Sequence, residues 1–306
     1  MNIIEKPLNI YKDKLKNIKL DYPKPRDEKA RNELPNLFAN YLIIGGRGCG
    51  KTHSTVAILK EFQQNDMITE DGAKHEVRVI WISPTGNSSS NKAILNNIDI
   101  NPEDMYDEYS DELLENIMNE TEQINEDVKK YKLYKDIYKL IEKTPIDKIK
   151  ALIKRRPEIP EILKEYDFRH PDDIDMKYKE RPIFCIVLDD LLGSDAFNKK
   201  STSKLLYYLI KNRHFYCQFF ILSQAIRGIT KSVRMNCNYF LLSKCASKKY
   251  ILQDMFDEVS NVIDEETFEK MYDLCCQEKH GSLIIDFTGS DKKFYKGLEK
   301  ELILNK

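Results

Sequence analysis

One stretch of this sequence has the spacing that binds the phosphates of a nucleotide. Residues 45–52 read GGRGCGKT and match the pattern GxxxxGK[ST] in full. Glycines at these positions let backbone N–H groups curve around a β-phosphate, the lysine reaches the β- and γ-phosphate oxygens, and the last hydroxyl binds Mg²⁺. The candidate nucleotide-binding residues are Gly45, Gly46, Arg47, Gly48, Cys49, Gly50, Lys51 and Thr52.

Two carboxylates follow the longest unbroken apolar run of the chain. Asp189 and Asp190 come directly after residues 183–188, which read IFCIVL. A P-loop hydrolase needs a carboxylate on the magnesium side of the phosphates, at the end of a neighbouring strand, and we expect Asp189 to bind Mg²⁺ through water. Asp190 would then face the γ-phosphate, where a carboxylate can polarise the attacking water. Capping of the next helix is the alternative role for Asp190.

A third polar side chain ends another apolar segment. Residues 219–222 read FFIL and are followed by Ser223 and Gln224. A neutral amide beside the γ-phosphate can orient water and respond to the loss of the phosphate, so Gln224 is a candidate sensor. The alternative is an amide at the end of a strand that bonds only to the backbone.

These side chains need strands and helices that hold them at one edge of a sheet. The run at 183–188 is apolar on both faces, as is typical of a central parallel strand. Strands alternating with helices predict an α/β fold with a mostly parallel sheet covered by helices. We expect strands near residues 38–44, 77–82, 183–188, 219–222, 239–242 and 283–286, and helices near 52–62, 205–210, 248–256 and 265–276.

Charge is sorted along the chain although its sum is only −1. Residues 103–127 carry eleven acidic side chains and no Lys or Arg, whereas residues 128–156 carry eleven basic and three acidic ones. The spacing of their apolar residues predicts a charged helical insertion over 101–180, whose two halves we expect to fold back as an antiparallel pair. Residues 196–253 hold eleven Lys or Arg and no Asp or Glu, which requires a polyanion, a neighbouring acidic surface or solvent.

Composition excludes several other classes of protein. No apolar run approaches the roughly 18 residues of a membrane-spanning helix, and residues 1–20 lack the apolar core of a secretory signal, so we expect a soluble protein. The seven cysteines have no zinc-site spacing, which indicates a reducing compartment. The expected organisation is an N-terminal arm over 1–35, a core over 36–100 and 181–290, the insertion, and a C-terminal tail over 291–306.

Together these motifs resemble the FtsK/HerA-type P-loop ATPases, and among them the poxvirus-type virion DNA-packaging ATPases of large DNA viruses and virophages. The chain departs from the family pattern at Asp190, where many relatives have glutamate, in its long insertion, and in lacking a proline pair after the sensor glutamine. The similar segments are GGRGCGKT, ISPT at 82–85, IVLDD at 186–190, NRH at 212–214, ILSQ at 221–224 and RMN at 234–236.

The resemblance implies a P-loop NTPase core of the ASCE or RecA-like type, and a motor that uses ATP and Mg²⁺ to translocate double-stranded DNA into a preformed capsid. Its partners would be duplex DNA, further copies of the chain in a homo-oligomeric ring, and capsid vertex proteins. The resemblance implies that the protein works at virus assembly sites in the host cytoplasm, and it is compatible with a further location in the virion.

In such rings an arginine of one subunit reaches the ATP of the next. Arg213, at the end of a helix before the sensor strand, is the best match, and Arg227 and Arg234 are the alternatives. Several lysines of the acid-free segment could face DNA, namely Lys199, Lys200, Lys204, Lys231, Lys248 and Lys249.

Two other functions fit the same motifs. A helicase or another DNA-remodelling ATPase uses the same core, and a nucleotide-binding scaffold would bind ATP for assembly without turnover. A small-molecule kinase is less favoured, because its lid is usually rich in arginine and the insertion has only Arg155, Arg156 and Arg169. A guanine-nucleotide switch would need an NKxD segment, and residues 91–94 read NKAI.

Overall fold

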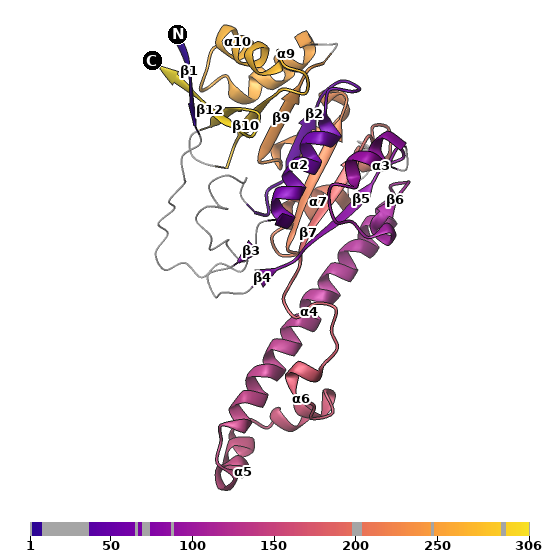
Figure 1. Ribbon diagram of the computed structural model, residues 1–306, viewed down its shortest axis with the longest axis vertical. Coiled ribbons are helices and arrows are strands. Elements are labelled where there is room, and N and C mark those ends of the chain that lie inside the picture. Colours follow the sequence, from indigo (N-terminus) through magenta and orange to yellow (C-terminus); the bar gives the residue numbers. More distant parts are fainter. Residues whose placement is uncertain are drawn as a thin grey trace. The chain divides into compact units, whose positions relative to one another are not determined.

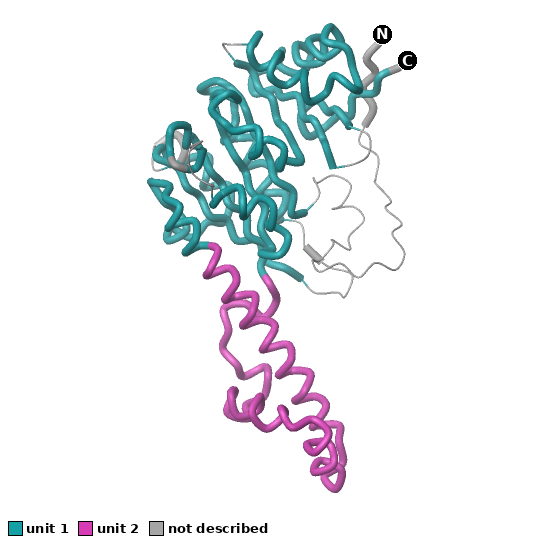
Figure 2. Tube along the Cα trace, turned by 180° about the vertical axis from the view of Figure 1, so that it is seen from behind, with its two compact units in different colours: residues 1–117, 182–306 teal, residues 118–181 magenta. Residues whose placement is uncertain are grey.

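The computed structural model describes residues 2–7, 37–64, 67–68, 74–86, 89–197, 204–245, 248–288 and 292–305. The chain forms two compact units, one of residues 1–117 and 182–306 and the other of residues 118–181 (Figure 2). The second unit overlaps the insertion expected over residues 101–180, beginning later and ending one residue beyond it. Among the described residues, no helix combines the length and the apolar character needed to cross a membrane.

A ten-stranded sheet of described residues dominates the first unit, in the order β1-β12-β11-β10-β9-β2-β8-β7-β5-β6 (Figure 1). The six strands from β9 to β6 in this order pair in parallel, and the remaining four pair antiparallel. The strands are β1 (Asn2–Pro7), β2 (Tyr41–Ile44), β5 (Val77–Ile82), β6 (Met105–Tyr106), β7 (Ile183–Asp189), β8 (Cys217–Ser223), β9 (Tyr239–Ser243), β10 (Ser282–Asp286), β11 (Lys293–Lys296) and β12 (Lys300–Asn305).

Helices follow most of the parallel strands, so the predicted α/β class with a mostly parallel sheet is confirmed. A short separate hairpin joins β3 (Met67–Ile68) to β4 (Lys74–His75). The helices are α2 (Lys51–Gln64), α3 (Ser89–Leu95), α4 (Asp111–Glu142), α5 (Ile146–Arg155), α6 (Ile159–Glu165), α7 (Lys204–Lys211), α8 (Lys231–Met235), α9 (Lys248–Val259) and α10 (Glu265–Cys276).

The central strands are apolar because both of their faces are covered. Every residue of β2, β7, β8 and β9 is buried. Tyr41 of β2 stacks on Phe220 of β8 at 4.3 Å between ring centroids and on Tyr239 of β9 at 5.2 Å, and both rings are its partners in the strand register. Each such aromatic pair contributes about 0.5–1.5 kcal/mol beyond area burial. This cross-strand stack holds β2 firmly between its two neighbours.

The structure differs from the expected boundaries at both ends of the chain. Residues 291–306, expected as a tail, contain β11 and β12, which extend the sheet beyond β10. Within the expected arm, β1 pairs with β12, and residues 8–36 lie outside the described residues. Antiparallel strands toward the edge of a sheet keep one face in water and carry charged residues, so they give a weaker signal than the central strands.

The expected antiparallel pair of acidic and basic helices is wrong, because α4 runs through both segments as a single helix. Residues 103–144 contain no Gly or Pro, so nothing in the sequence stops the helix at the change of charge. Acidic residues occupy its first turn and Lys139 its last, which suits the helix dipole. Within the second unit, α4 buries a stripe at helical spacing, namely Thr121, Asn125, Val128, Tyr131, Tyr134 and Ile137.

Candidate nucleotide-binding site

The GxxxxGK[ST] loop connects β2 to α2 at the edge of the sheet where the parallel strands end (Figure 1). The amide of Gly45 donates to the carbonyl oxygen of Ser223 at 3.1 Å, at the end of β8. The next amide, of Gly46, donates to the carbonyl oxygen of Lys244 at 3.0 Å, directly after β9. The beginning of the loop is therefore bonded to both neighbouring strands.

Glycine is required by the shape of this loop. Gly50 has φ +103°, a conformation that side chains rarely adopt. At Gly45 the obstacle is space, because a Cβ there would lie 2.3 Å from the Cys49 sulfur and 2.9 Å from the Ser243 Cβ. The predicted phosphate cradle thus has the close turns that its glycines were expected to permit.

Lys51 and Thr52 open α2 directly after the cradle. The Lys51 ammonium donates to the carbonyl oxygens of Gly45 at 2.8 Å and Gly46 at 3.2 Å, so it lies over the loop. Amides at a helix N-terminus favour anions, and α2 presents them beside this cation. Hydroxyl and carboxylate oxygens are donors that Mg²⁺ prefers, and Thr52 supplies one of them.

Asp189 ends β7 as a buried carboxylate with 4% exposure. Burial raises its pKa to about 6; the charge of Lys51 opposes this rise and the charge of Asp190 adds to it. The Ser83 hydroxyl, which follows β5, donates to the Asp189 Oδ2 at 3.4 Å and favours the ionised form. The predicted magnesium ligand therefore lies near the P-loop lysine, and Ser83 of the ISPT segment is a neighbour to which the sequence assigns no role.

Asp190 and Gln224 meet at the ends of the adjacent strands β7 and β8. The Gln224 Nε2 donates to the Asp190 Oδ1 at 3.0 Å. Asp190 has φ +56°, an uncommon conformation for a residue with a side chain, although Asp tolerates it better than most. Strained backbone of this kind concentrates at functional sites. The structure thus brings together the two side chains that the sequence suggested for the γ-phosphate.

Arg213 lies at the opposite end of the parallel strands, where β8 begins. It comes just before β8, and its neighbour Asn212 donates to the carbonyl oxygen of Phe38, ahead of β2, at 2.6 Å. The seven residues of β8 span roughly 23 Å at about 3.3 Å per residue, and the P-loop follows the other end of the adjacent strand β2. Arg213 is exposed, and the structure does not bring it to the P-loop of its own chain.

The two alternative arginines have partners within the chain. Arg227 forms an ion pair with Asp254 at 2.7 Å and lies over the Tyr250 ring at 4.5 Å. Arg234 donates to the carbonyl oxygen of Ile229 at 2.8 Å, which fixes the turn ahead of α8. The first arrangement ties the segment between β8 and β9 to α9, and the second holds that segment together.

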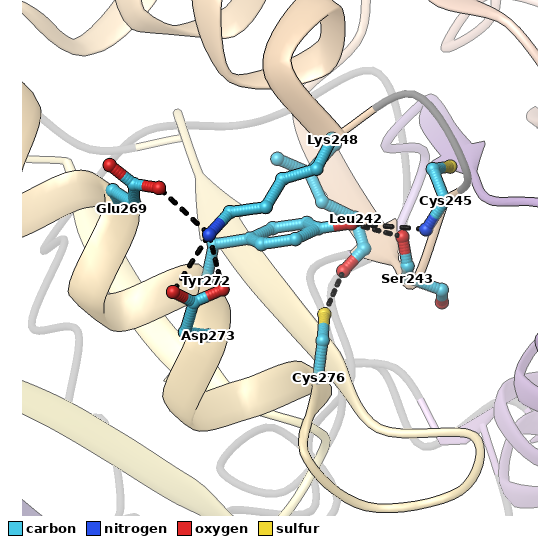
Figure 3. Close-up of polar contacts among 8 residues, drawn as sticks. All are labelled: Leu242, Ser243, Cys245, Lys248, Glu269, Tyr272, Asp273 and Cys276. Carbon is cyan, nitrogen blue, oxygen red and sulfur yellow. Dashed lines mark hydrogen bonds and ion pairs between the residues drawn. The ribbon is translucent and has the colours of Figure 1, made fainter.

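Tyr272 of α10 supports the P-loop indirectly, through the segment after β9, and the sequence analysis did not identify this residue. Its hydroxyl donates to the carbonyl oxygen of Ser243 at 2.9 Å and accepts from the amide of Cys245 at 3.2 Å (Figure 3). The residue between them is Lys244, whose carbonyl accepts from the Gly46 amide. One hydroxyl thus holds the segment that bonds to the loop. A tyrosine at a buried helical position carries no sequence signal for this role.

Carboxylates from elsewhere in the chain pair with part of the acid-free segment 196–253. Lys204 bonds to Glu115 of α4 at 2.9 Å. Lys248 contacts two carboxylates of α10, at 2.8 and 2.7 Å, and so ties α9 to α10 (Figure 3). Two of the lysines expected to face DNA are therefore paired within the chain, and Lys199 and Lys200 lie outside the described residues.

No family model and no curated protein matches the sequence. Among solved structures, the genome packaging NTPase B204 of Sulfolobus turreted icosahedral virus 2 is similar at 13% identity and a TM-score of 0.44, over 86% of this chain and 100% of that one. ATPases 2 and 3 of EssC from Geobacillus thermodenitrificans are similar at 12% identity and a TM-score of 0.41, over 97% and 46%.

The N-terminal domain of zonular occludens toxin from Neisseria meningitidis is similar at 15% identity and a TM-score of 0.30, over 70% of this chain and 79% of that one.

We predict that Asp189→Asn stabilises the ligand-free protein at pH 8. The folded-state pKa of Asp189, about 6, lies above the ordinary value of 3.8, so ionisation opposes folding as pH rises through this window. Urea unfolding with EDTA should show a gain on the order of 3 kcal/mol at pH 8 that falls well below about 1 kcal/mol near pH 4. Asp257→Asn, at an exposed position, should change little at either pH. If the variant were less stable than wild type at pH 8, the claim that the buried, ionised Asp189 carboxylate destabilises the ligand-free fold would be wrong.

Proposed function

We propose that this protein is an ATP-driven motor that moves double-stranded viral DNA into a preformed capsid. The observation that carries the ATPase part is the meeting of Lys51, Asp189, Asp190 and Gln224 around the P-loop edge. A phosphate cradle alone would suit a binding protein. Hydrolysis of the γ-phosphate needs more. It is suited by the buried Asp189 near Lys51, together with the Asp190 carboxylate that accepts a hydrogen bond from the Gln224 amide.

The residues divide the chemistry among them. Thr52 and Asp189 would hold Mg²⁺, which supplies charge neutralisation on the phosphates. Lys51 would exchange its two carbonyl partners for phosphate oxygens, because a charged acceptor is the stronger one. Asp190 would accept a proton from the attacking water, and Gln224 would fix the orientation of that carboxylate through its hydrogen bond.

The motor part requires more than one copy of the chain. Arg213 lies at the sheet edge opposite the P-loop, so any contact with a γ-phosphate would be to the nucleotide of a neighbouring subunit. Large apolar side chains are exposed on the packed pair α7 and α8, with Tyr207 at 47%, Ile210 at 62% and Met235 at 68%. Exposed apolar residues of this size beside Arg213 fit an interface with a second copy in a homo-oligomeric ring.

Duplex DNA would meet lysines that have no carboxylate partner among the described residues. Among the described residues of the acid-free segment, Lys231, Lys244 and Lys249 are exposed and form no ion pair. Such cations bind phosphates without reading bases. Packaging further entails a capsid vertex partner and work at the assembly site in the host cytoplasm, with the virion as a second location.

We predict that duplex DNA stimulates ATP hydrolysis and that its affinity falls steeply with salt. In Lys231→Ala/Lys249→Ala, duplex should bind more weakly, with the slope against log salt reduced by about 0.9 for each lost contact. Lys204→Ala is the control, because Glu115 already pairs with that lysine. Turnover unaffected by DNA would contradict the proposal, strand displacement would indicate a helicase, and ATP binding without turnover would indicate a scaffold.

A mixing experiment tests the arginine in trans. Arg213→Ala should be nearly inactive, because removal of such an arginine costs on the order of a thousandfold in related phosphoryl transfers. Lys51→Ala should be nearly inactive because its own P-loop loses the charge that stabilises the phosphates. Mixed before assembly, they form some interfaces that pair an intact P-loop with an intact arginine, so ATPase activity should partly return. A mixture as inactive as its parents would contradict a trans role for Arg213, and recovery with Arg227 or Arg234 variants instead would move the role to that residue.

A further inference from the structure

The order of the strands gives the nucleotide site two distinct ends. β2 and its P-loop lie between β8 and β9. Asp189 ends β7, Asp190 follows it and Gln224 follows β8, so the groups suited to the γ-phosphate all lie on one side of the loop. If the proposed function is right, the nucleoside of a bound nucleotide extends to the other side, toward β9 and β10.

A histidine occupies that side. β10 is antiparallel to β9, with Ser282 opposite Ser243, so the beginning of β10 lies at the edge where the parallel strands end. His280 comes two residues before this strand. Its side chain lies against the P-loop, because a Cβ on Gly50 would be 2.8 Å from both its Cβ and its Nδ1.

The backbone around His280 is held in a costly conformation. His280 has φ +68°, in the left-handed region where residues with side chains are uncommon. At Gly281 no side chain fits, since a Cβ would lie 2.1 Å from the carbonyl oxygen of Cys275. A strained backbone of this kind persists only where the surrounding structure holds it in place, and such residues cluster at functional sites. The turn directs an exposed imidazole to the P-loop.

A second imidazole accompanies it. His53 directly follows Thr52 in the first turn of α2, and its ring lies 6.1 Å from the His280 ring between centroids, at an interplanar angle of 17°. Both histidines are exposed. Two nearly parallel aromatic rings at the end of the loop away from the catalytic carboxylates offer planar faces on which a nucleobase can stack.

We propose that His280, with His53 beside it, is the contact for the nucleoside of bound ATP and supports its base by stacking. The inference rests on the proposed nucleotide binding and assigns the end of the site that the P-loop motif leaves open. Stacking uses the face of a base, so the contact would favour ligands with a base over those without one and would distinguish weakly between purines.

Calorimetric titration with two magnesium-bound ligands tests this contact. One ligand is a non-hydrolysable ATP analogue and the other is inorganic tripolyphosphate, which has the phosphates and no nucleoside. His280→Ala should weaken the analogue about tenfold, the size of one base–aromatic stack, and leave tripolyphosphate within twofold. His280→Phe, which keeps a planar ring, should retain most of the affinity for the analogue.

Two controls separate this contact from other causes. Lys51→Ala should weaken both ligands, and His214→Ala, an exposed histidine near the opposite sheet edge, should weaken neither. Equal loss of both ligands in His280→Ala would show that the histidine only shapes the P-loop, and no loss would show that it touches no ligand; either result overturns the inference. Failure of the wild-type protein to bind either ligand would overturn the proposed nucleotide binding, and this inference with it.

Discussion

Two backbone hydrogen bonds, from Gly45 to Ser223 and from Gly46 to Lys244, fix the phosphate loop to the strands on its two sides. The first places the loop beside β8, whose end carries Gln224, and the second places it beside β9, whose end Tyr272 holds from α10. These bonds exist because β2 pairs in parallel with both strands, which therefore end at the same edge. A shift of either strand by one residue would misplace the groups on that side relative to the phosphates.

Charge at this edge is balanced at some cost to stability. Asp189 is buried, and the charge of Lys51 offsets only part of the penalty that raises the pKa of this carboxyl. The ammonium itself is bonded to loop carbonyls, which it would leave for phosphate oxygens. Asp190 and His280 add positive φ angles on either side of the loop. Stability given up at one edge, within a sheet of buried strands, is the pattern expected of a site built for a charged ligand.

Local signals allowed the central strands and the P-loop edge to be predicted from sequence. An apolar run followed by a polar residue marks both β7 with Asp189 and β8 with Gln224, and the glycine spacing marks the loop. The rest depends on contacts between distant segments. The pairing of Lys204 with Glu115, the support from Tyr272 and the approach of His280 to Gly50 join residues that no local pattern connects. The single helix α4 was missed because its change of charge suggested a boundary that only Gly or Pro would enforce.

ATP turnover by Lys51→Ala, beside wild type and with folding checked by thermal melting, tests the central claim most directly. Among the described residues, the Lys51 ammonium bonds to two loop carbonyls and is not part of the apolar core, so the variant should keep its fold. If the P-loop edge hydrolyses ATP, turnover should fall by roughly a hundredfold to a thousandfold, the loss typical when one charge-stabilising donor is removed. A folded Lys51→Ala protein with wild-type turnover would show that the chemistry takes place elsewhere.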